Sequence, residues 1–85
     1  MKHAGAAALD RIAPLLDLLR TRTALKEKTR GVFYRGGRAF LHFHEDSAEI
    51  FADFRPEQDF VRLPVTTPAQ QTALLRKIDT VLLKD

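Results

Sequence analysis

Cysteine is absent from the 85 residues of this chain. Without thiols the protein can form no disulfide, no thiolate nucleophile and no zinc or iron–sulfur site with cysteine ligands. The first eight residues lack the apolar run of a signal peptide, and no segment approaches the roughly 18 apolar residues that cross a membrane. We therefore expect a cytoplasmic protein with no membrane partner.

The common catalytic motifs are absent as well. Ser47 is the only serine and lies in a predicted turn, and Gly36-Gly37 lacks the Lys-Ser or Lys-Thr that would follow in a phosphate-binding loop. The catalytic alternative that remains is a histidine acting as a general base, oriented by Asp53 or Glu49. Because a small open sheet has no pocket of the usual active-site size, we do not expect an enzyme.

Hydrophobic residues make up 45% of the chain and charged residues 29%, which is the balance of a globular protein. A chain of this length builds one core, so we expect a single domain over residues 1–85, with residues 1–8 flexible. The net charge is +3, but basic and acidic residues occupy different segments of the chain. Residues 20–38 contain seven basic residues and one acid, whereas residues 39–59 contain six acids and one arginine. Such a bipolar pattern does not by itself indicate nucleic acid binding.

Two segments have the apolar periodicity of helices. The first predicts a helix over residues 10–21, with an extension to Lys28 left open. Pro14 restricts this helix, because proline is tolerated only in a first turn, so the helix either starts just before Pro14 or kinks there. In the second segment, Thr67-Pro68-Ala69-Gln70 is the pattern of a capping box and predicts the start of a C-terminal helix.

Four apolar runs between these helices predict strands, at residues 32–34, 39–44, 49–54 and 60–63. Gly36-Gly37 indicates a tight hairpin turn between the first two runs, because glycine adopts the positive φ that such turns need. The expected fold is an α+β two-layer sandwich of order α-β-β-β-β-α. In this fold an antiparallel meander of three or four strands is flanked by an N-terminal and a C-terminal helix.

Alternation along the strands sorts their side chains onto two faces. The expected register pairs Arg35 with Arg38 across the turn, so that Phe33 faces Phe40. One face is expected to be the core beneath the helices, and it carries Val32, Tyr34, Leu41, Phe43, Ile50, Ala52, Phe54, Val61 and Leu63. The other face is the expected binding surface, and it carries Phe33, Arg35, Phe40, His42, His44, Glu49, Phe51, Asp53, Phe60 and Arg62.

Four phenylalanines on an uncovered sheet face would form the kind of patch that marks a binding or assembly surface. We therefore predict a non-catalytic module, with a homodimer that stacks sheet on sheet as the leading hypothesis. Single-stranded nucleic acid is an alternative partner, because bases stack on aromatic rings and arginines bind phosphates, although Glu49 and Asp53 on the same face weaken this hypothesis. In a further alternative, the N-terminal helix, the N-terminal segment or residues 22–30 cover this face as a second core layer.

A metal site at His42 and His44 is another alternative. The His-x-His spacing places both imidazoles on one side of a strand, about 7 Å apart, with Glu49 or Asp53 on the neighbouring strand. Two histidines and a carboxylate are a competent ligand set for zinc, iron or manganese, and the expected ligands are His42, His44 and Asp53. The pattern is common by chance, so the default expectation is no cofactor. Nothing in the sequence assigns a role to His3.

The segment Gly31-Val-Phe-Tyr34, together with Arg38-Ala-Phe-Leu-His-Phe-His-Glu-Asp46 and Phe51-Ala-Asp53, resembles a group of small uncharacterised bacterial proteins. The resemblance covers about half of the chain. It implies neither a reaction nor a ligand, only that the central hairpins are the signature of the group. No functional residue follows from it.

Overall fold

The sheet of the computed structural model, which describes residues 1–84, is antiparallel throughout. Its strands are β1 (Lys2–His3), β2 (Lys26–Thr29), β3 (Val32–Arg35), β4 (Arg38–Asp46), β5 (Glu49–Phe54) and β6 (Val61–Pro64). The order β2-β3-β4-β5-β6 is the predicted meander, with more strands than expected. The short β1 lies off this path and pairs with the end of β4.

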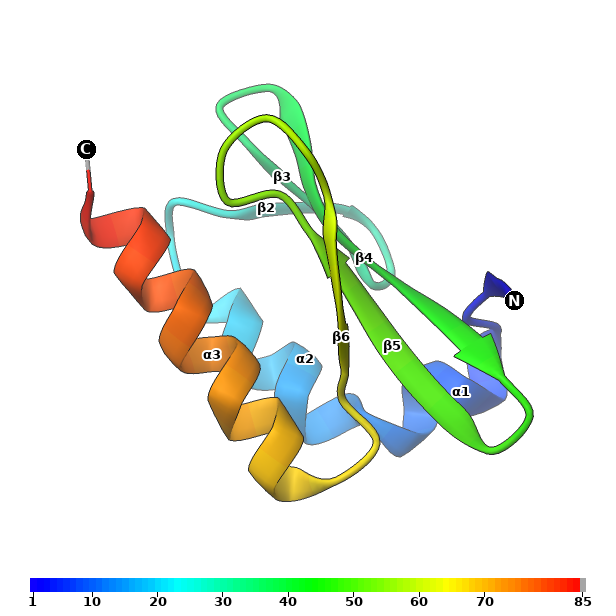
Figure 1. Ribbon diagram of the computed structural model, residues 1–85. Helices are drawn as coiled ribbons and strands as arrows, with labels where there is room; N and C mark the ends of the chain where they lie inside the picture. The colour runs from blue at the N-terminus through cyan, green and yellow to red at the C-terminus, as the bar shows by residue number, and fades with distance from the viewer. Residues whose placement is uncertain (85) are drawn as a thin grey trace.

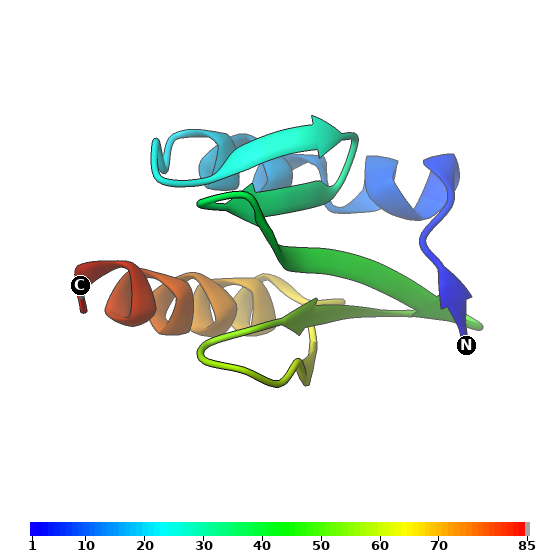
Figure 2. The same ribbon diagram turned by 90° about the horizontal axis from the view of Figure 1, so that it is seen from above.

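Three helices lie on one side of this sheet: α1 (Ala6–Arg11), α2 (Ala13–Arg20) and α3 (Pro68–Leu83). Figure 1 shows them along the left and the bottom of the view, and Figure 2 shows α1 and α2 along one half of the sheet and α3 along the other. The predicted two-layer α+β class, with helices towards both ends of the chain, is confirmed. In the described part of the chain, no helix has the length and apolar character needed to cross a membrane.

The N-terminal helical segment is divided at Ile12, whose φ of −108° and ψ of 22° are not helical. Pro14 then lies in the first turn of α2, where proline costs no backbone hydrogen bond. Helix α1 begins at Ala6, within the segment expected to be flexible. The predicted start at Thr67 is confirmed for α3, because its hydroxyl accepts the N–H of Gln70 at 3.2 Å and the Gln70 side chain accepts the N–H of Thr67 at 3.0 Å.

The sequence does not predict strand β2. The extension of the first helix to Lys28, which the sequence leaves open, is wrong. The Lys-Glu-Lys-Thr sequence of β2 contains no apolar residue, and the strand lies at an edge of the sheet. An edge strand with little buried surface needs no apolar alternation, so the sequence has no signal for it.

A β-bulge changes the predicted register between β3 and β4. Arg35 pairs with Arg38 as predicted, but Tyr34 pairs with Ala39 and Phe33 with Leu41, so Phe40 is an extra residue on β4. The bulge brings Phe33 to the same face as Leu41. The prediction that Phe33 and Phe40 lie towards solvent is wrong, because their side chains are only 1% and 4% exposed.

The hydrophobic core lies between the sheet and the helices. It includes the predicted residues of β4 and β5, whereas Val32 and Tyr34 of β3 are only half-buried, because the bulge reverses the alternation of that strand. Val61 at the edge strand β6 is exposed, contrary to prediction. The buried apolar residues are Ala8, Leu9, Ile12, Leu15, Leu16, Leu19, Phe33, Phe40, Leu41, Phe43, Ile50, Ala52, Phe54, Val65, Leu74 and Ile78.

Candidate metal centre

The face of the sheet that points away from the helices carries a cluster of histidines. Leu41 and Phe43 of β4 are buried in the core, so His42 and His44 point to the opposite face. On β5, Phe51 and Asp53 alternate in the same way with core residues. We name the side of the sheet that carries His3, His42, His44, Phe51, Asp53 and Arg62 the histidine face.

His3 joins the cluster through β1. It pairs with His44 in the sheet, and the adjacent Ala4 N–H donates to the Phe43 carbonyl at 3.0 Å. The rings of His3 and His44 stack with centroids 4.5 Å apart. Those of His42 and His44 meet edge to face at 5.1 Å, and those of His3 and His42 lie 6.0 Å apart. Two strands from distant parts of the sequence therefore bring three imidazoles together.

The three histidines are close enough to share one metal ion. One ring nitrogen from each lies within 4.8 Å of those of the other two. Zinc binds imidazole nitrogen at about 2.0–2.1 Å, so two ligands of one tetrahedral ion lie about 3.3 Å apart. The nitrogens that are farthest apart would therefore have to approach each other by about 1.5 Å to share one ion. Three nitrogen ligands also leave a coordination position for water or another ligand.

Burial favours the neutral form of two of these imidazoles, those of His42 and His44. Burial lowers the pKa of both His42 and His44, and this effect outweighs the attraction of Asp53. The Nδ1 atoms of both residues are buried and have no hydrogen-bond partner among residues 1–84. Since a metal binds the unprotonated nitrogen, the site has the donor state that a cation requires. Buried polar atoms usually have a partner, so these two nitrogens need an explanation.

Asp53 supports the cluster and is itself held by Arg62. The guanidinium donates to both carboxylate oxygens at 2.7 Å, and this hydrogen bonding holds the pKa of Asp53 below its ordinary value. The Asp53 Oδ2 lies 3.1 Å from Nδ1 of His44, close enough for attraction but out of line for a hydrogen bond. A carboxylate beside a metal-binding histidine orients the ring and increases its basicity, which fits Asp53 better than direct ligation.

The other predicted binding-surface residues are divided among different places. Phe51 is half-buried on the histidine face, and Phe60 precedes β6, with its ring 5.0 Å from that of His42. Glu49 accepts a hydrogen bond from Thr66 at 2.9 Å. Phe33 and Phe40 are in the core, and Arg35 follows the alternation of Phe33 and so lies on the helix side of the sheet.

The sequence contains no local signal for the role of His3. A two-residue strand has no periodicity, and its pairing with β4 depends on the path of the chain through α1 and α2. His42 and His44 could be found because they are two residues apart on a strong strand. Only a search for all histidines near that strand in three dimensions reveals the third.

Comparisons of this chain with protein families, with curated proteins and with solved structures gave no match. The candidate function therefore depends on the geometry of the site.

Proposed function

We propose that this protein is a binding module for a divalent transition-metal ion, with His3, His42 and His44 as the protein ligands. The observation that carries the proposal is the convergence of three imidazole nitrogens within 4.8 Å of one another. Two of these rings also have buried Nδ1 atoms without a hydrogen-bond partner in the described residues. A bound cation would satisfy the Nδ1 of His42, which otherwise loses its solvation without compensation, whereas the Nδ1 of His44 lies 3.1 Å from the carboxylate of Asp53.

The ligand set favours zinc and its neighbours in the first transition series. Imidazole suits Zn²⁺, Cu²⁺, Ni²⁺ and Fe²⁺, whereas Mg²⁺ and Ca²⁺ prefer oxygen ligands. Asp53 is engaged by Arg62 in a two-point ion pair, so in this proposal it orients His44 rather than supplying a ligand. The proposed ligand set thus replaces the carboxylate expected from the sequence with His3.

Single-stranded nucleic acid has less support as a ligand of this face. Two of the four aromatic rings expected to stack bases are in the core. The guanidinium of Arg62 is paired with Asp53, so its charge is already compensated. Binding of nucleic acid needs a positive surface, and burial lowers the pKa of His42 and His44, which favours their neutral state.

The test is a zinc titration of the metal-stripped protein in competition with a chromophoric chelator. We expect one ion per chain, and at least a tenfold loss of affinity for each of His3→Gln, His42→Gln and His44→Gln. Lys2→Gln is the matched control, because it changes the neighbouring residue of β1 and is expected to leave affinity unchanged. Cobalt added in place of zinc should give visible absorption bands that disappear in the His42→Gln variant.

Two results would contradict the proposal. One is a native protein that binds zinc no more tightly than the variant in which all three histidines are glutamine. The other is an equal loss of affinity in Lys2→Gln and His3→Gln, which would indicate that β1 acts by its backbone and not by an imidazole ligand.

A further inference from the structure

Two strands share one edge of β4 and leave a gap between them. Strand β3 pairs with β4 along residues 38–41, and β1 pairs with residues 44 and 45, while β5 occupies the opposite edge of β4. His42 and Phe43 lie between these two segments and pair with neither β3 nor β1. The sheet is therefore interrupted at this point of the edge.

The gap forms a small cavity, which we name the β4 notch. Residues of both partner strands line it, His3 of β1 and Val32 of β3, together with His42 of β4. Its volume is about 130 Å³, the space that roughly four water molecules occupy in the liquid. A ligand of about four or five non-hydrogen atoms therefore fits in it.

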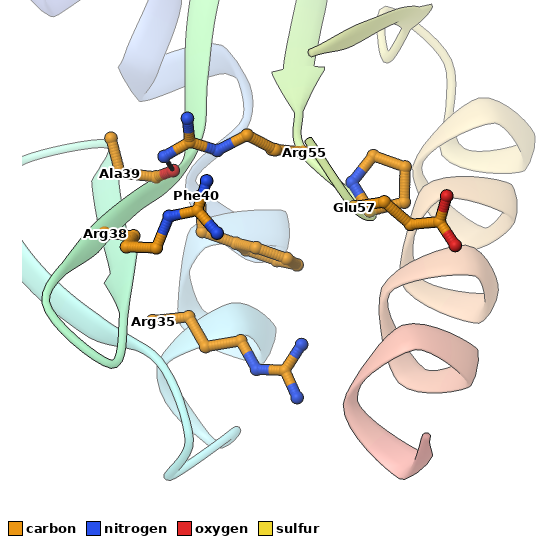
Figure 3. Close-up of a pocket in the computed structure, with 7 residues that line it drawn as sticks. Arg35, Arg38, Ala39, Phe40, Arg55 and Glu57 are labelled. Carbon is orange, nitrogen blue, oxygen red and sulfur yellow. Dashed lines mark hydrogen bonds between the residues drawn. The ribbon is translucent and has the colours of Figure 1, made fainter. Parts of the chain in front are cut away.

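The other irregularity of β4, the bulge at Phe40, is bridged by a side chain. Figure 3 shows Arg55 extending to Ala39 beside the bulge, and its guanidinium donates a hydrogen bond to the Ala39 carbonyl. The cavity that remains there has a volume of about 70 Å³. The β4 notch is the larger of these two cavities and borders the three-histidine cluster.

Two of the three proposed metal ligands line the β4 notch. These are His3 and His42, whose ring centroids lie 6.0 Å apart. An ion held by the nitrogens of both rings would therefore lie beside the cavity. Three imidazoles leave one position of a tetrahedral ion open, and the notch is a space from which a small ligand can reach that position.

The positive charge that a ligand would meet in the notch is that of the ion. Imidazole binds a metal in its neutral form, so a divalent ion with three histidine ligands keeps both of its charges. Arg30 also lines the notch, but its guanidinium is paired with Asp10 at 2.7 Å and its charge is compensated. The site would thus attract an anion through the metal.

The remaining lining of the notch is apolar. Its side chains offer a ligand neither a charge nor a hydrogen bond, and it consists of Ala4, Leu9, Gly31, Val32 and Phe43. A ligand that matches this lining has an anionic oxygen at one end, for the ion, and an apolar group at the other. A short organic acid has both, whereas bicarbonate and phosphate are polar on every side.

We propose that the β4 notch binds a carboxylate of two or three carbons, with one oxygen on the metal ion and the apolar end against Leu9 and Val32. The inference rests on the proposed metal-binding function. The carboxylate takes the coordination position that water occupies otherwise. The size of the notch sets its specificity: acetate and propionate fit, whereas the branched acid pivalate is too large.

The test titrates the cobalt-loaded full chain with each acid at constant ionic strength and follows the visible absorption bands. We expect saturable changes with acetate and propionate. Pivalate carries the same charge and the same metal-binding group, and we expect it to bind about tenfold more weakly because it exceeds the cavity.

Variants of the lining test the same point from the side of the protein. Ala4→Leu fills part of the notch and should weaken propionate about tenfold while cobalt affinity is retained. Ala7→Leu is the matched control, because Ala7 is exposed on α1 and does not line the notch, and both affinities should stay unchanged. Val32→Ala, on the other partner strand, enlarges the notch and should strengthen the binding of pivalate relative to propionate.

The failure of this inference can be told apart from the failure of the proposed function. A chain that binds no cobalt contradicts both. Cobalt bands that none of the acids changes would overturn the inference alone, as would pivalate binding as tightly as propionate or equal effects of Ala4→Leu and Ala7→Leu. Bicarbonate binding more tightly than propionate would overturn the assignment to an organic acid.

Discussion

At the scale of single residues, Glu27 shows how one half-buried carboxylate joins three parts of the chain. It lies on β2 and receives two hydrogen bonds from Arg20 at the end of α2, at 2.5 and 3.0 Å. It also accepts the backbone N–H of Gly31 at 2.8 Å. Hydrogen bonding from Arg20 is the main cause that holds the pKa of Glu27 below its ordinary value, and burial opposes it.

This lowered pKa predicts a pH dependence of stability. Because the folded state holds the Glu27 proton less tightly than the unfolded state, the stabilisation is complete above the ordinary glutamate pKa of about 4.5 and is lost as the pH falls through the lower folded value. Glu27→Gln should reduce the free energy of unfolding by about 1 kcal/mol at pH 7 and by much less at pH 3. Urea unfolding at a series of pH values measures the difference.

Asp46 supplies the control for this experiment. Its side chain is exposed and forms no ion pair with the described residues. Asp46→Asn should therefore change stability by less than Glu27→Gln at pH 7. A Glu27→Gln effect that is the same at pH 3 and pH 7 would show that packing, not charge, accounts for it.

At the scale of elements, the β2–β3 and β3–β4 turns need glycine for different reasons. Gly31 and Gly37 both have positive φ, 80° and 82°. A Cβ atom on Gly31 would lie 2.8 Å from Cδ2 of the buried Leu9, whereas a Cβ on Gly37 would meet no atom within 4 Å. The first turn is thus packed on α1, and the second projects into solvent.

The pair of substitutions Gly31→Ala and Gly37→Ala separates backbone strain from packing. Gly37→Ala should cost about 1 kcal/mol, which is the strain of a positive φ for a residue with a Cβ. Gly31→Ala should cost roughly 1–3 kcal/mol more, because Leu9 must move within a packed core. Thermal and urea unfolding of the two variants measure the difference. Equal losses would mean that Leu9 adjusts freely.

The elements that the sequence predicts are those with strong local signals. The capping box at Thr67 and the glycine pair of the β3–β4 turn specify their conformations within a few residues, and the structure confirms both. The bulge at Phe40 has no such signal, because it depends on how the two strands pack on the helices. A shift by one residue changes the face of every side chain beyond it, which is why alternation alone places Phe33 on the wrong face.

At the scale of the whole molecule, self-association through the sheet stays a prediction, and the side chains that would carry it are now different. Phe51 and Phe60 are the remaining phenylalanines of the four that are not in the core. A sheet-stacked dimer predicts that Phe51→Ser combined with Phe60→Ser gives a monomer by light scattering. Phe40→Ser should instead lower stability by about 3–5 kcal/mol, because it leaves a cavity in the core.

The outcome of that measurement separates two uses of the same surface. A native dimer that survives the double substitution would exclude stacking through these rings. A change in mass that follows zinc and not the phenylalanines would assign association to the histidines.

The sequence predicts two of the three proposed ligands of the candidate metal centre, whereas the third depends on how the whole chain folds. His42 and His44 lie on one strand, so alternation alone places them together. His3 enters through the pairing of β1 with β4, a contact between positions separated by about 40 residues. Contacts of this range are set by the packing of everything between them, which no local pattern contains.

Because β1 pairs with β4, the proposed metal would also affect the stability of the fold. An ion shared by His3 and His42 would close a covalent-like loop of about 40 residues, and both α1 and α2 lie within that loop. Cross-linking a loop of this size reduces the entropy of the unfolded chain by an amount equivalent to roughly 4 kcal/mol. In a chain without cysteine, three imidazoles and one ion would thus form a cross-link that holds the N-terminal helices to the sheet.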